Sequence, residues 1–456
     1  MSAAPATPPS VALAPTDDGA RLIPAVVPPR PLDPLDVRER TLSAGLRVLA
    51  VARPGIPVVE LRLRVPFAGG ADDRLAERTL LTETLLTGTA SRDRLRLATD
   101  LQSLGGGLSA SADADRLAVV GSVLAPNLTD LLGIIAEVVT GASYPDDEVA
   151  GERERIVTEL GIARSQPSLL AREALLARLY GAHPYAREVP TPEQQASVSA
   201  DEVRALHAAR VVPSGAVLTL VGDLDAEAAL DAVEAALSGW AGASGPGVPP
   251  LPAHQPGRVR IVDRPGAVQT NIRLGGPALA RDDPRYSALQ VANTIFGGYF
   301  SSRLVLNIRE GKGYTYSPRS GIEHGLAGSR LTVGADVATE VSAPALLEIG
   351  YELGRIGVLP VSSEELEGAR QYAMGSLALS TATSAGLAST LSMLAGAGLG
   401  PEYLIEHPAA LARVTAAEVQ ELAAEFLAPS ALTSVLLGDA ARISGPVSVL
   451  SALDEQ

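Results

Sequence analysis

One stretch of the chain is repeated within its own sequence, and this repeat limits the folds that the chain can adopt. Residues 198–223 (VSADEVRALHAARVVPSGAVLTLVGD) align without a gap with residues 414–439 (VTAAEVQELAAEFLAPSALTSVLLGD), and 11 of the 26 positions are identical. Each copy has Ser or Thr before an amphipathic segment, as at a helix N-cap, then a Pro-Ser turn and an apolar run ending in Gly-Asp. Self-similarity at a fixed spacing indicates a repeated structural unit. The sequence therefore predicts one αβ unit used twice.

The repeat extends upstream and divides the chain into two halves, since residues 146–153 (DDEVAGER) resemble residues 363–370 (SEELEGAR). Between the halves, residues 239–258 (GWAGASGPGVPPLPAHQPGR) are dense in Gly and Pro, which sustain neither a helix nor a central strand. We expect an α+β protein with mixed sheets covered by helices on one face. Its predicted parts are a disordered Pro/Ala-rich tail at 1–40, a first αβ domain at 41–240, a linker at 241–258, a second αβ domain at 259–445 and a C-terminal tail at 446–456.

Hydrophobic patterning predicts the first elements of each half. Residues 45–70 (GLRVLAVARPGIPVVELRLRVPFAGG) alternate apolar and polar side chains around a Pro-Gly pair, which favours a β-hairpin before the helix that contains Thr79. In the second half, residues 268–276 (VQTNIRLGG) predict a strand and residues 286–298 (YSALQVANTIFGG) a helix ending at glycines. Each half is thus expected to begin with strands and end with helices.

Composition narrows the classes of function. The 456 residues are 46% hydrophobic and 20% charged, enough for two or three domains with their own cores. A net charge of −15 without any basic run argues against nucleic acid or an anionic membrane as a partner. No apolar run reaches the roughly 18 residues of a membrane span, and the N-terminus lacks the pattern of a signal peptide, so we expect a cytoplasmic protein. The absence of cysteine excludes disulfides, thiolate metal sites and cysteine nucleophiles.

Four segments resemble the pitrilysin, insulinase and mitochondrial processing peptidase group of zinc peptidases. The resemblance covers roughly residues 40–445 and implies a clamshell built from two similar αβ halves. Its most specific part is FGGYFSSRLVLNIREGKGYTYSP at residues 296–318. The other parts are TLSAGLRVLAVARPGIPVVELRLRV at 41–65, LLTGT at 85–89 and HPY at 183–185.

At the position of the family's metal site this chain departs from the pattern. Active members carry His-x-x-Glu-His on the helix before Gly-Thr, where two imidazoles on one helical face bind zinc and the glutamate acts as general base. The corresponding residues here are Thr79, Thr82 and Glu83, and Glu159 stands 76 residues later, where the family has a third ligand. Two carboxylates without imidazole make a poor zinc site. We expect this chain to bind no metal.

The residues themselves offer a simpler interpretation of this helix. Thr79, Thr82 and Thr87 can fill a half-buried helix by donating hydrogen bonds to carbonyls one turn earlier. None of the five histidines pairs with another ligand at a zinc spacing. His183 is expected to be a turn residue packed against the following aromatic ring, and His207 a structural residue on the repeated helix.

The resemblance implies that Arg309 and Tyr316 hold the substrate during hydrolysis from the domain that faces the metal. A guanidinium offers rigid donors to a peptide carbonyl, and a phenol can donate to the oxyanion that develops when water attacks. Tyr314 is a second candidate for the tyrosine role. The alternative is a solvated arginine and a core tyrosine.

Neighbouring residues are expected to contact the substrate as well. The resemblance places Gly297 and Gly298 in a flexible loop near the substrate chamber, followed by Ser301. With the Arg/Tyr pair but no zinc motif, the chain resembles one member of a heterodimeric peptidase, whose homologous partner supplies zinc and encloses short or unfolded peptides, such as leader peptides. Neither nucleic acid nor membrane is expected as a partner. The alternative function is a catalytically inert structural or peptide-binding scaffold; an independent hydrolase lacks any serine elbow.

Overall fold

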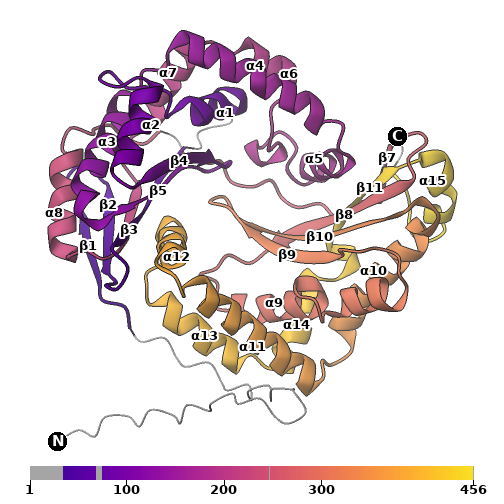
Figure 1. Ribbon diagram of the computed structural model, residues 1–456. Coiled ribbons are helices and arrows are strands. Elements are labelled where there is room, and N and C mark those ends of the chain that lie inside the picture. The colour runs from indigo at the N-terminus through magenta and orange to yellow at the C-terminus, as the bar shows by residue number, and fades with distance from the viewer. Residues whose placement is uncertain (1–33, 68–73, 246, 455–456) are drawn as a thin grey trace, which may run out of the picture.

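The computed structural model describes residues 34–67, 74–245 and 247–454, which form two mixed sheets enclosed by helices (Figure 1). In the first sheet the strand order is β1-β2-β6-β3-β5-β4, and in the second it is β7-β11-β8-β10-β9. Both are antiparallel except for the parallel pairs β2·β6 and β7·β11. The expected α+β clamshell is confirmed. The strands are β1 (Val37–Thr41), β2 (Arg47–Ala52), β3 (Val58–Pro66), β4 (Gly107–Ala112), β5 (Arg116–Leu124), β6 (Val217–Gly222), β7 (Arg260–Asp263), β8 (Gln269–Ala278), β9 (Arg319–His324), β10 (Ser329–Ala338) and β11 (Thr433–Gly438).

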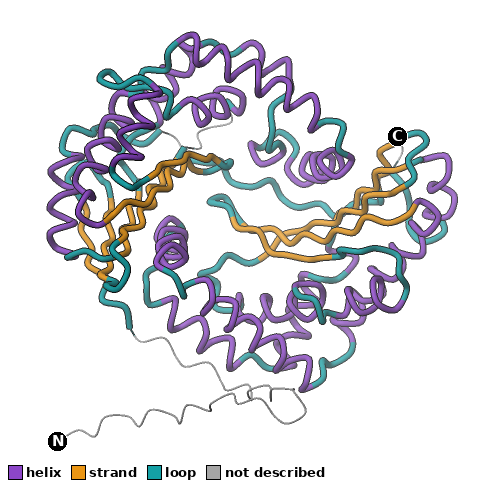
Figure 2. The backbone as a smooth tube through the Cα atoms, viewed as in Figure 1, coloured by secondary structure: helices purple, strands orange, loops and turns teal. Residues whose placement is uncertain are grey.

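The helices lie mainly on the outside of the two sheets (Figure 2). Two π-helical turns, η3 (Thr294–Gly298) and η4 (Val305–Gly311), follow α9 in the second half. Helices of the first half are α1 (Leu75–Thr84), α2 (Arg94–Ser103), α3 (Leu128–Gly141), α4 (Asp146–Ala163), α5 (Pro167–Tyr180), α6 (Pro192–Ser197), α7 (Ala200–Arg210) and α8 (Ala226–Leu237). Those of the second half are α9 (Tyr286–Asn293), α10 (Ser342–Val358), α11 (Ser363–Ser380), α12 (Ser384–Gly396), α13 (Tyr403–Arg413), α14 (Ala416–Phe426) and α15 (Ala440–Ser448).

The repeated αβ unit has the same structure in both halves. Helices α7 and α14 each begin with a capping box. The side chain of Ser199 or Thr415 accepts from the backbone N–H three residues later, and the glutamate at that later position accepts from the backbone N–H of Ser199 or Thr415. The strands that follow, β6 and β11, are buried at every position and lie inside their sheets. The repeat in the sequence therefore encodes a central strand and its flanking helix.

The prediction of a β-hairpin over residues 45–70 is wrong, although both of its strands form. Strand β6 lies between them, paired parallel with β2 and antiparallel with β3. Residues 68–70 of the predicted hairpin lie outside the described residues. A strand as apolar as β6 needs a paired strand on each edge, and the connection between β2 and β3 is long enough for β6 to lie between them.

Each half covers the inner face of the other half's sheet with one helix. Helix α12 packs through Leu387, Leu391 and Leu394 on Val51 and Val221 of the first sheet. Conversely, α5 lies on the second sheet, and its closest approach is over a glycine of β8. A Cβ on Gly275 would lie 2.9 Å from Leu179 Cδ1, so a larger residue would force this leucine side chain to shift. The two halves are therefore interlocked rather than merely joined, with α5 and α12 exchanged (Figure 1).

The ends of the described structure extend beyond the predicted domains. Residues 1–33 of the predicted tail lie outside the described residues, but β1 already begins at Val37. This strand, VRERT, has no apolar alternation, and Arg40 holds it to α8 through Asp231 and Glu234. At the other end, α15 continues to Ser448, and Leu453 forms a bridge with Val259.

Among the described residues, no single helix is long and apolar enough to cross a bilayer. Helices α11 and α12 reach that length and composition only as a pair, and the two meet at an angle of 108°.

Candidate functional site

The helix at the position of the family's zinc motif is held together by its own threonines. Thr79 donates to the Leu75 carbonyl and Thr82 to the Arg78 carbonyl, both at 2.8 Å, and Thr87 donates to the Thr84 carbonyl at 2.8 Å. The interpretation of these threonines as helix-filling residues is therefore confirmed. All three hydroxyls donate to backbone carbonyls of α1, Thr87 from just beyond its C-terminal end, and none of these positions holds an imidazole.

The two carboxylates predicted near the degenerate motif do meet, and the cation between them is a guanidinium. Arg155 on α4 lies 2.7 Å from Glu83 Oε2 and 2.6 Å from Glu159 Oε1. A third carboxylate, Glu152, lies 2.5 Å from Arg155 Nε. The hydrogen bonds that Arg155 donates to Glu152 and, with a smaller effect, to Glu159 raise the pKa of Arg155, so its positive charge is permanent.

A zinc ion does not fit these residues. Zinc prefers nitrogen and sulfur ligands in a tetrahedral arrangement, whereas this site offers carboxylates that are already paired with Arg155. In the part of the chain that the structure describes, no group of three or more His, Asp or Glu side chains is arranged to hold a metal ion.

The two histidines singled out in the sequence are structural, as predicted. His183 accepts from the Tyr185 backbone N–H, and the two rings lie edge to face with centroids 4.8 Å apart. His207 is buried on α7, 2.7 Å from the Tyr144 hydroxyl and 3.0 Å from the Val139 carbonyl oxygen. Burial lowers the pKa of His207, which keeps the imidazole neutral.

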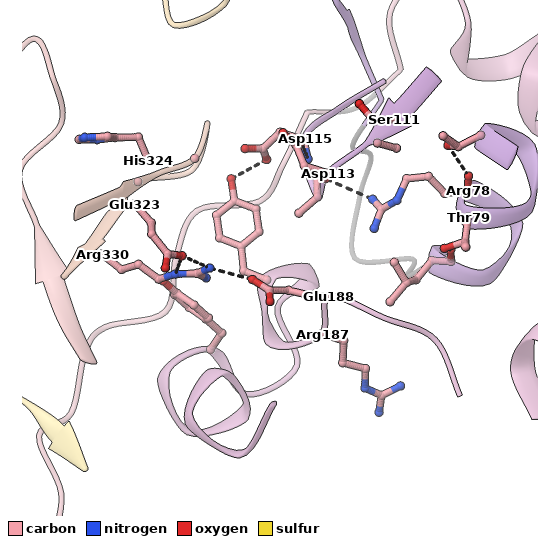
Figure 3. A pocket seen from close by; sticks show the side chains of 18 of the residues that line it. Arg78, Thr79, Ser111, Asp113, Asp115, Arg187, Glu188, Glu323, His324 and Arg330 are labelled. Atoms are coloured by element: carbon pink, nitrogen blue, oxygen red, sulfur yellow. Dashed lines mark hydrogen bonds and ion pairs between the residues drawn. The ribbon is translucent and has the colours of Figure 1, made fainter. Parts of the chain in front are cut away.

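A pocket of about 480 Å³ separates the motif helix from the second half (Figure 3). On one side, α1 contributes Thr79 and Glu83, and the β4–β5 connection contributes Asp113. The opposite wall comes from the β9–β10 hairpin, including Glu323 and Arg330. The degenerate motif therefore faces an internal chamber between the halves.

The two halves are joined at the chamber by a hydrogen-bonded latch, which we define as Asp115, Tyr185, Leu326 and Ala327. The Tyr185 hydroxyl donates to Asp115 Oδ1 at 2.5 Å, and the Leu326 N–H donates to Asp115 Oδ2 at 2.8 Å. The Ala327 N–H donates in turn to the Tyr185 hydroxyl at 3.1 Å. Because Asp115 is 5% exposed, these bonds are shielded from water. The latch ties the β9–β10 turn to the first half.

An ion network lies beside the latch and also crosses between the halves. Arg172 and Glu188 of the first half pair with each other, and both contact charges on β9 and β10. Glu323 receives Arg172 at 2.9 Å and Arg330 Nε at 2.7 Å. Although burial raises the pKa of Glu323, the two arginines prevail and lower it to about 2. Their ion pairs join the two halves beside the chamber, where Figure 3 shows Glu188, Glu323 and Arg330.

The Arg/Tyr pair lies in a separate exposed cluster, which we define as Phe300, Arg309 and Tyr316. The Arg309 guanidinium carbon lies 4.8 Å from the Phe300 ring centroid and 4.6 Å from that of Tyr316. The side chain of Tyr316 is 80% exposed and that of Phe300 is 61% exposed. Neither Arg309 nor Tyr316 is among the described residues that line the chamber. The cluster therefore presents a cation between two aromatic faces to the outside of the second half.

The other residues predicted to contact substrate have different surroundings. Gly297 and Gly298 end the π-helical turn η3 and do not form a loop. A Cβ on Gly297 would lie 2.7 Å from Ser320 Oγ, so close packing explains this glycine. Ser301 is exposed just before η4, while Tyr314 packs against the second core and donates its N–H to the Ile308 carbonyl.

The structure thus brings Glu83 and Glu159 together and places Arg309 against Tyr316. It does not bring these two groups to one site within the chain. Sequence reasoning missed Arg155, although its spacing from Glu159 is the i, i+4 spacing of a helical ion pair. It also missed Asp115 and Tyr185, which no short motif connects.

Comparison with known proteins gives consistent similarities. Residues 79–193 match the family model described as insulinase (peptidase family M16), and residues 197–372 match the model described as the peptidase M16 inactive domain. An uncharacterized zinc protease of Mycobacterium tuberculosis is 26% identical over 413 residues, 87% of this chain and 93% of that protein. One from Streptomyces coelicolor is 26% identical over 292 residues, covering 62% of this chain and 63% of that protein.

Solved structures show the same fold. The crystal structure of a peptidase M16 inactive domain from Pseudomonas fluorescens superposes with a TM-score of 0.80 at 26% identity, covering 89% of this chain and 98% of the other. A protease from Helicobacter pylori has a TM-score of 0.81 at 17% identity, covering 89% of this chain and all of that chain, and this likeness concerns the fold alone.

Proposed function

Because the chain belongs to the M16 family of peptidases, as its motifs indicated, we propose that it is the substrate-holding, non-metal subunit of a two-chain endopeptidase. The motif helix supports this proposal, since threonines and Glu83 replace the metal ligands and Glu83 is paired with Arg155. A chain of this kind needs a homologous partner that carries the zinc.

The observation that carries the proposal is the exposure of the Phe300–Arg309–Tyr316 cluster. Within the chain this cluster is separate from the lining of the chamber that the motif helix faces, because none of its members is among the described residues that line it. Tyr316 is nevertheless 80% exposed, which is unusual for an aromatic side chain held in a fixed contact. An exposed aromatic and arginine cluster of this type is well suited to a site completed by another polypeptide.

In such a site the two side chains have distinct roles. Arg309 lies over both rings and its Nε pairs with Glu310 at 3.2 Å, so its position is set before substrate arrives and its other N–H groups can donate to a peptide carbonyl. The Tyr316 hydroxyl can donate to the oxygen that becomes negative as the scissile carbonyl is attacked, which stabilises the transition state more than the substrate. The partner would supply the zinc-bound water. Short or unfolded peptides, including leader peptides, are the proposed substrates.

The test is to purify this chain with a homologous zinc-bearing partner and to measure turnover of a peptide panel. We expect Arg309→Ala and Tyr316→Phe each to lower kcat/KM by about 10²-fold, the usual effect of removing an oxyanion donor. Arg442→Ala and Tyr351→Phe, on exposed side chains of α15 and α10, are matched controls and should leave turnover unchanged. Chelator-sensitive cleavage by this chain alone would refute the proposal.

A structural role is the second candidate, and the latch and Arg155 favour it. The latch joins the two halves, and the Arg155 side chain pairs with Glu83 and Glu159, where the family has metal ligands. The same experiment separates the two functions. If the complex forms and cleaves peptides, but neither Arg309→Ala nor Tyr316→Phe changes kcat/KM, the chain is a scaffold.

A further inference from the structure

A second pocket, of about 400 Å³, lies within the second half between α9, the edge strand β9 and helices α11 to α13. It shares no residue with the Phe300–Arg309–Tyr316 cluster and does not depend on the role proposed for that cluster. Exposed residues of α11, Tyr372 and Ser376, form part of its rim, so it is reached from solvent. Its volume falls within the range of small-molecule and peptide-end sites.

One end of this pocket carries a positive charge without a carboxylate. Arg281 lines it, and none of the described lining residues is Asp or Glu, in a chain whose net charge is −15. The nearby Asp283 is paired with Arg285, and Asp282 is exposed and outside the lining. The Arg281 Nε atom is buried without a hydrogen-bond acceptor. This end therefore offers a cation whose natural complement is an anion.

The groups around Arg281 are neutral and add a donor. His407 is stacked on the Tyr403 ring at 4.6 Å, and its Nε2 lies 2.7 Å from Gln290 Oε1. Burial and Arg281 lower its pKa to about 4, so it contributes no competing charge. Burial raises the pKa of the Tyr403 hydroxyl, and Arg281 beside it acts in the opposite direction. Its O–H can therefore donate to the same anion as Arg281.

At the other end of the pocket, one buried acceptor has no hydrogen-bond partner. Asn293 is 7% exposed and lines the pocket, yet its Oδ1 atom is buried without a partner. An orphaned amide oxygen of this kind requires an N–H or O–H from a ligand. Along α9, Asn293 is seven residues beyond Tyr286, whose ring Arg281 overlies, so the two ends are separated by roughly 10 Å at 1.5 Å per residue.

We propose that this pocket binds the C-terminal end of a short extended peptide. The carboxylate is held by Arg281 and Tyr403, and a backbone N–H roughly three residues upstream donates to Asn293, since extended chain covers about 3.4 Å per residue. Apolar lining residues of α11 and α12, including Leu377, Met393 and Leu394, contact the peptide side chains. The ligand class is thus a peptide with a free carboxyl terminus, and the site holds it without reacting with it.

The test is calorimetric titration of the purified chain with N-acetyl-Ala-Leu-Leu and with the same peptide as its C-terminal amide. We expect the amide to bind at least about tenfold more weakly, because it lacks the charge that Arg281 recognises. Arg281→Gln should weaken binding of the acid by about tenfold and leave the amide unchanged. Arg285→Gln, four residues away and outside the pocket, is the matched control and should bind like the original chain.

Tyr403→Phe keeps the experiment decisive if Arg281→Gln fails to fold. Because this change keeps the ring and removes only the hydroxyl beside Arg281, the variant should fold and should bind the acid about fivefold more weakly. Equal affinity for acid and amide, or an affinity for N-acetyl-leucine that equals that for the tripeptide, overturns the proposal. So does the absence of binding to the acid at millimolar concentration.

Discussion

The latch between the halves predicts a specific effect of Tyr185→Phe. This change removes one oxygen and keeps the ring, so packing is preserved while two hydrogen bonds are lost. The bond to buried Asp115 is charge-assisted and contributes about 1.5–3 kcal/mol. The Ala327 N–H loses its acceptor, which costs about a further 1 kcal/mol.

Together these losses destabilise the latch by about 2.5–4 kcal/mol, and opening should increase roughly 60-fold to several hundred-fold because each 1.4 kcal/mol is a factor of ten. The readout is hydrogen exchange at the Leu326 and Ala327 amides, which are the donors at the β9–β10 turn. Both should exchange faster in the variant by that factor.

Tyr351→Phe serves as the control, because Tyr351 is 56% exposed on α10 and lies outside the latch. It should leave exchange at both amides unchanged. If Leu326 and Ala327 exchange at the original rate in Tyr185→Phe, the hydroxyl does not hold the halves together and the assignment of the latch is wrong.

Three further predictions follow from the ion network, the motif helix and the exchanged helices. The folded-state pKa of Glu323 is about 2, which is below its ordinary value of 4.5. The stabilising effect of the carboxylate is therefore complete above about pH 4.5 and is lost as the pH falls towards 2. The difference in unfolding free energy between the original chain and Glu323→Gln should shrink over that range. A variant that combines Thr79→His, Thr82→Glu and Glu83→His should bind stoichiometric zinc, measured by elemental analysis, only when Arg155→Gln is added. The reason is that the Arg155 cation otherwise pairs with the Glu159 ligand. Retention of zinc by the variant without Arg155→Gln would contradict this. Leu391→Ala should lower the free energy of unfolding by about 2–5 kcal/mol in denaturant titration, whereas Leu379→Ala, at 78% exposure, should lower it by less than about 1 kcal/mol.

Local chemistry made part of this structure predictable. The capping residues Ser199 and Thr415 and the apolar runs of β6 and β11 are local signals, and they define the repeated unit. The behaviour of Thr79 and Thr82 was likewise predictable, because a threonine hydroxyl reaches the carbonyl four residues earlier in any helix.

Long-range pairing was not predictable from the same signals. Alternation around residues 53–57 correctly indicated two strands but not that β6 separates them, since periodicity identifies the buried face and not the neighbour. The contact of Arg155 with Glu83 joins two helices that are 72 positions apart in sequence. Arg281 and Asn293 form one pocket only because helices α11 to α13 fold back over α9.

The exchange of α5 and α12 also decides how this protein can be divided. A cut within the Gly/Pro linker would leave each fragment with the helix that belongs over its sister's sheet, while its own strands would expose Val51 and Val221, or Val435, to solvent. Fragments made separately would thus be prone to aggregate, and only co-expression would yield soluble material. The smallest foldable unit is therefore the pair of halves. Cutting the linker should disturb the structure less than removing either half.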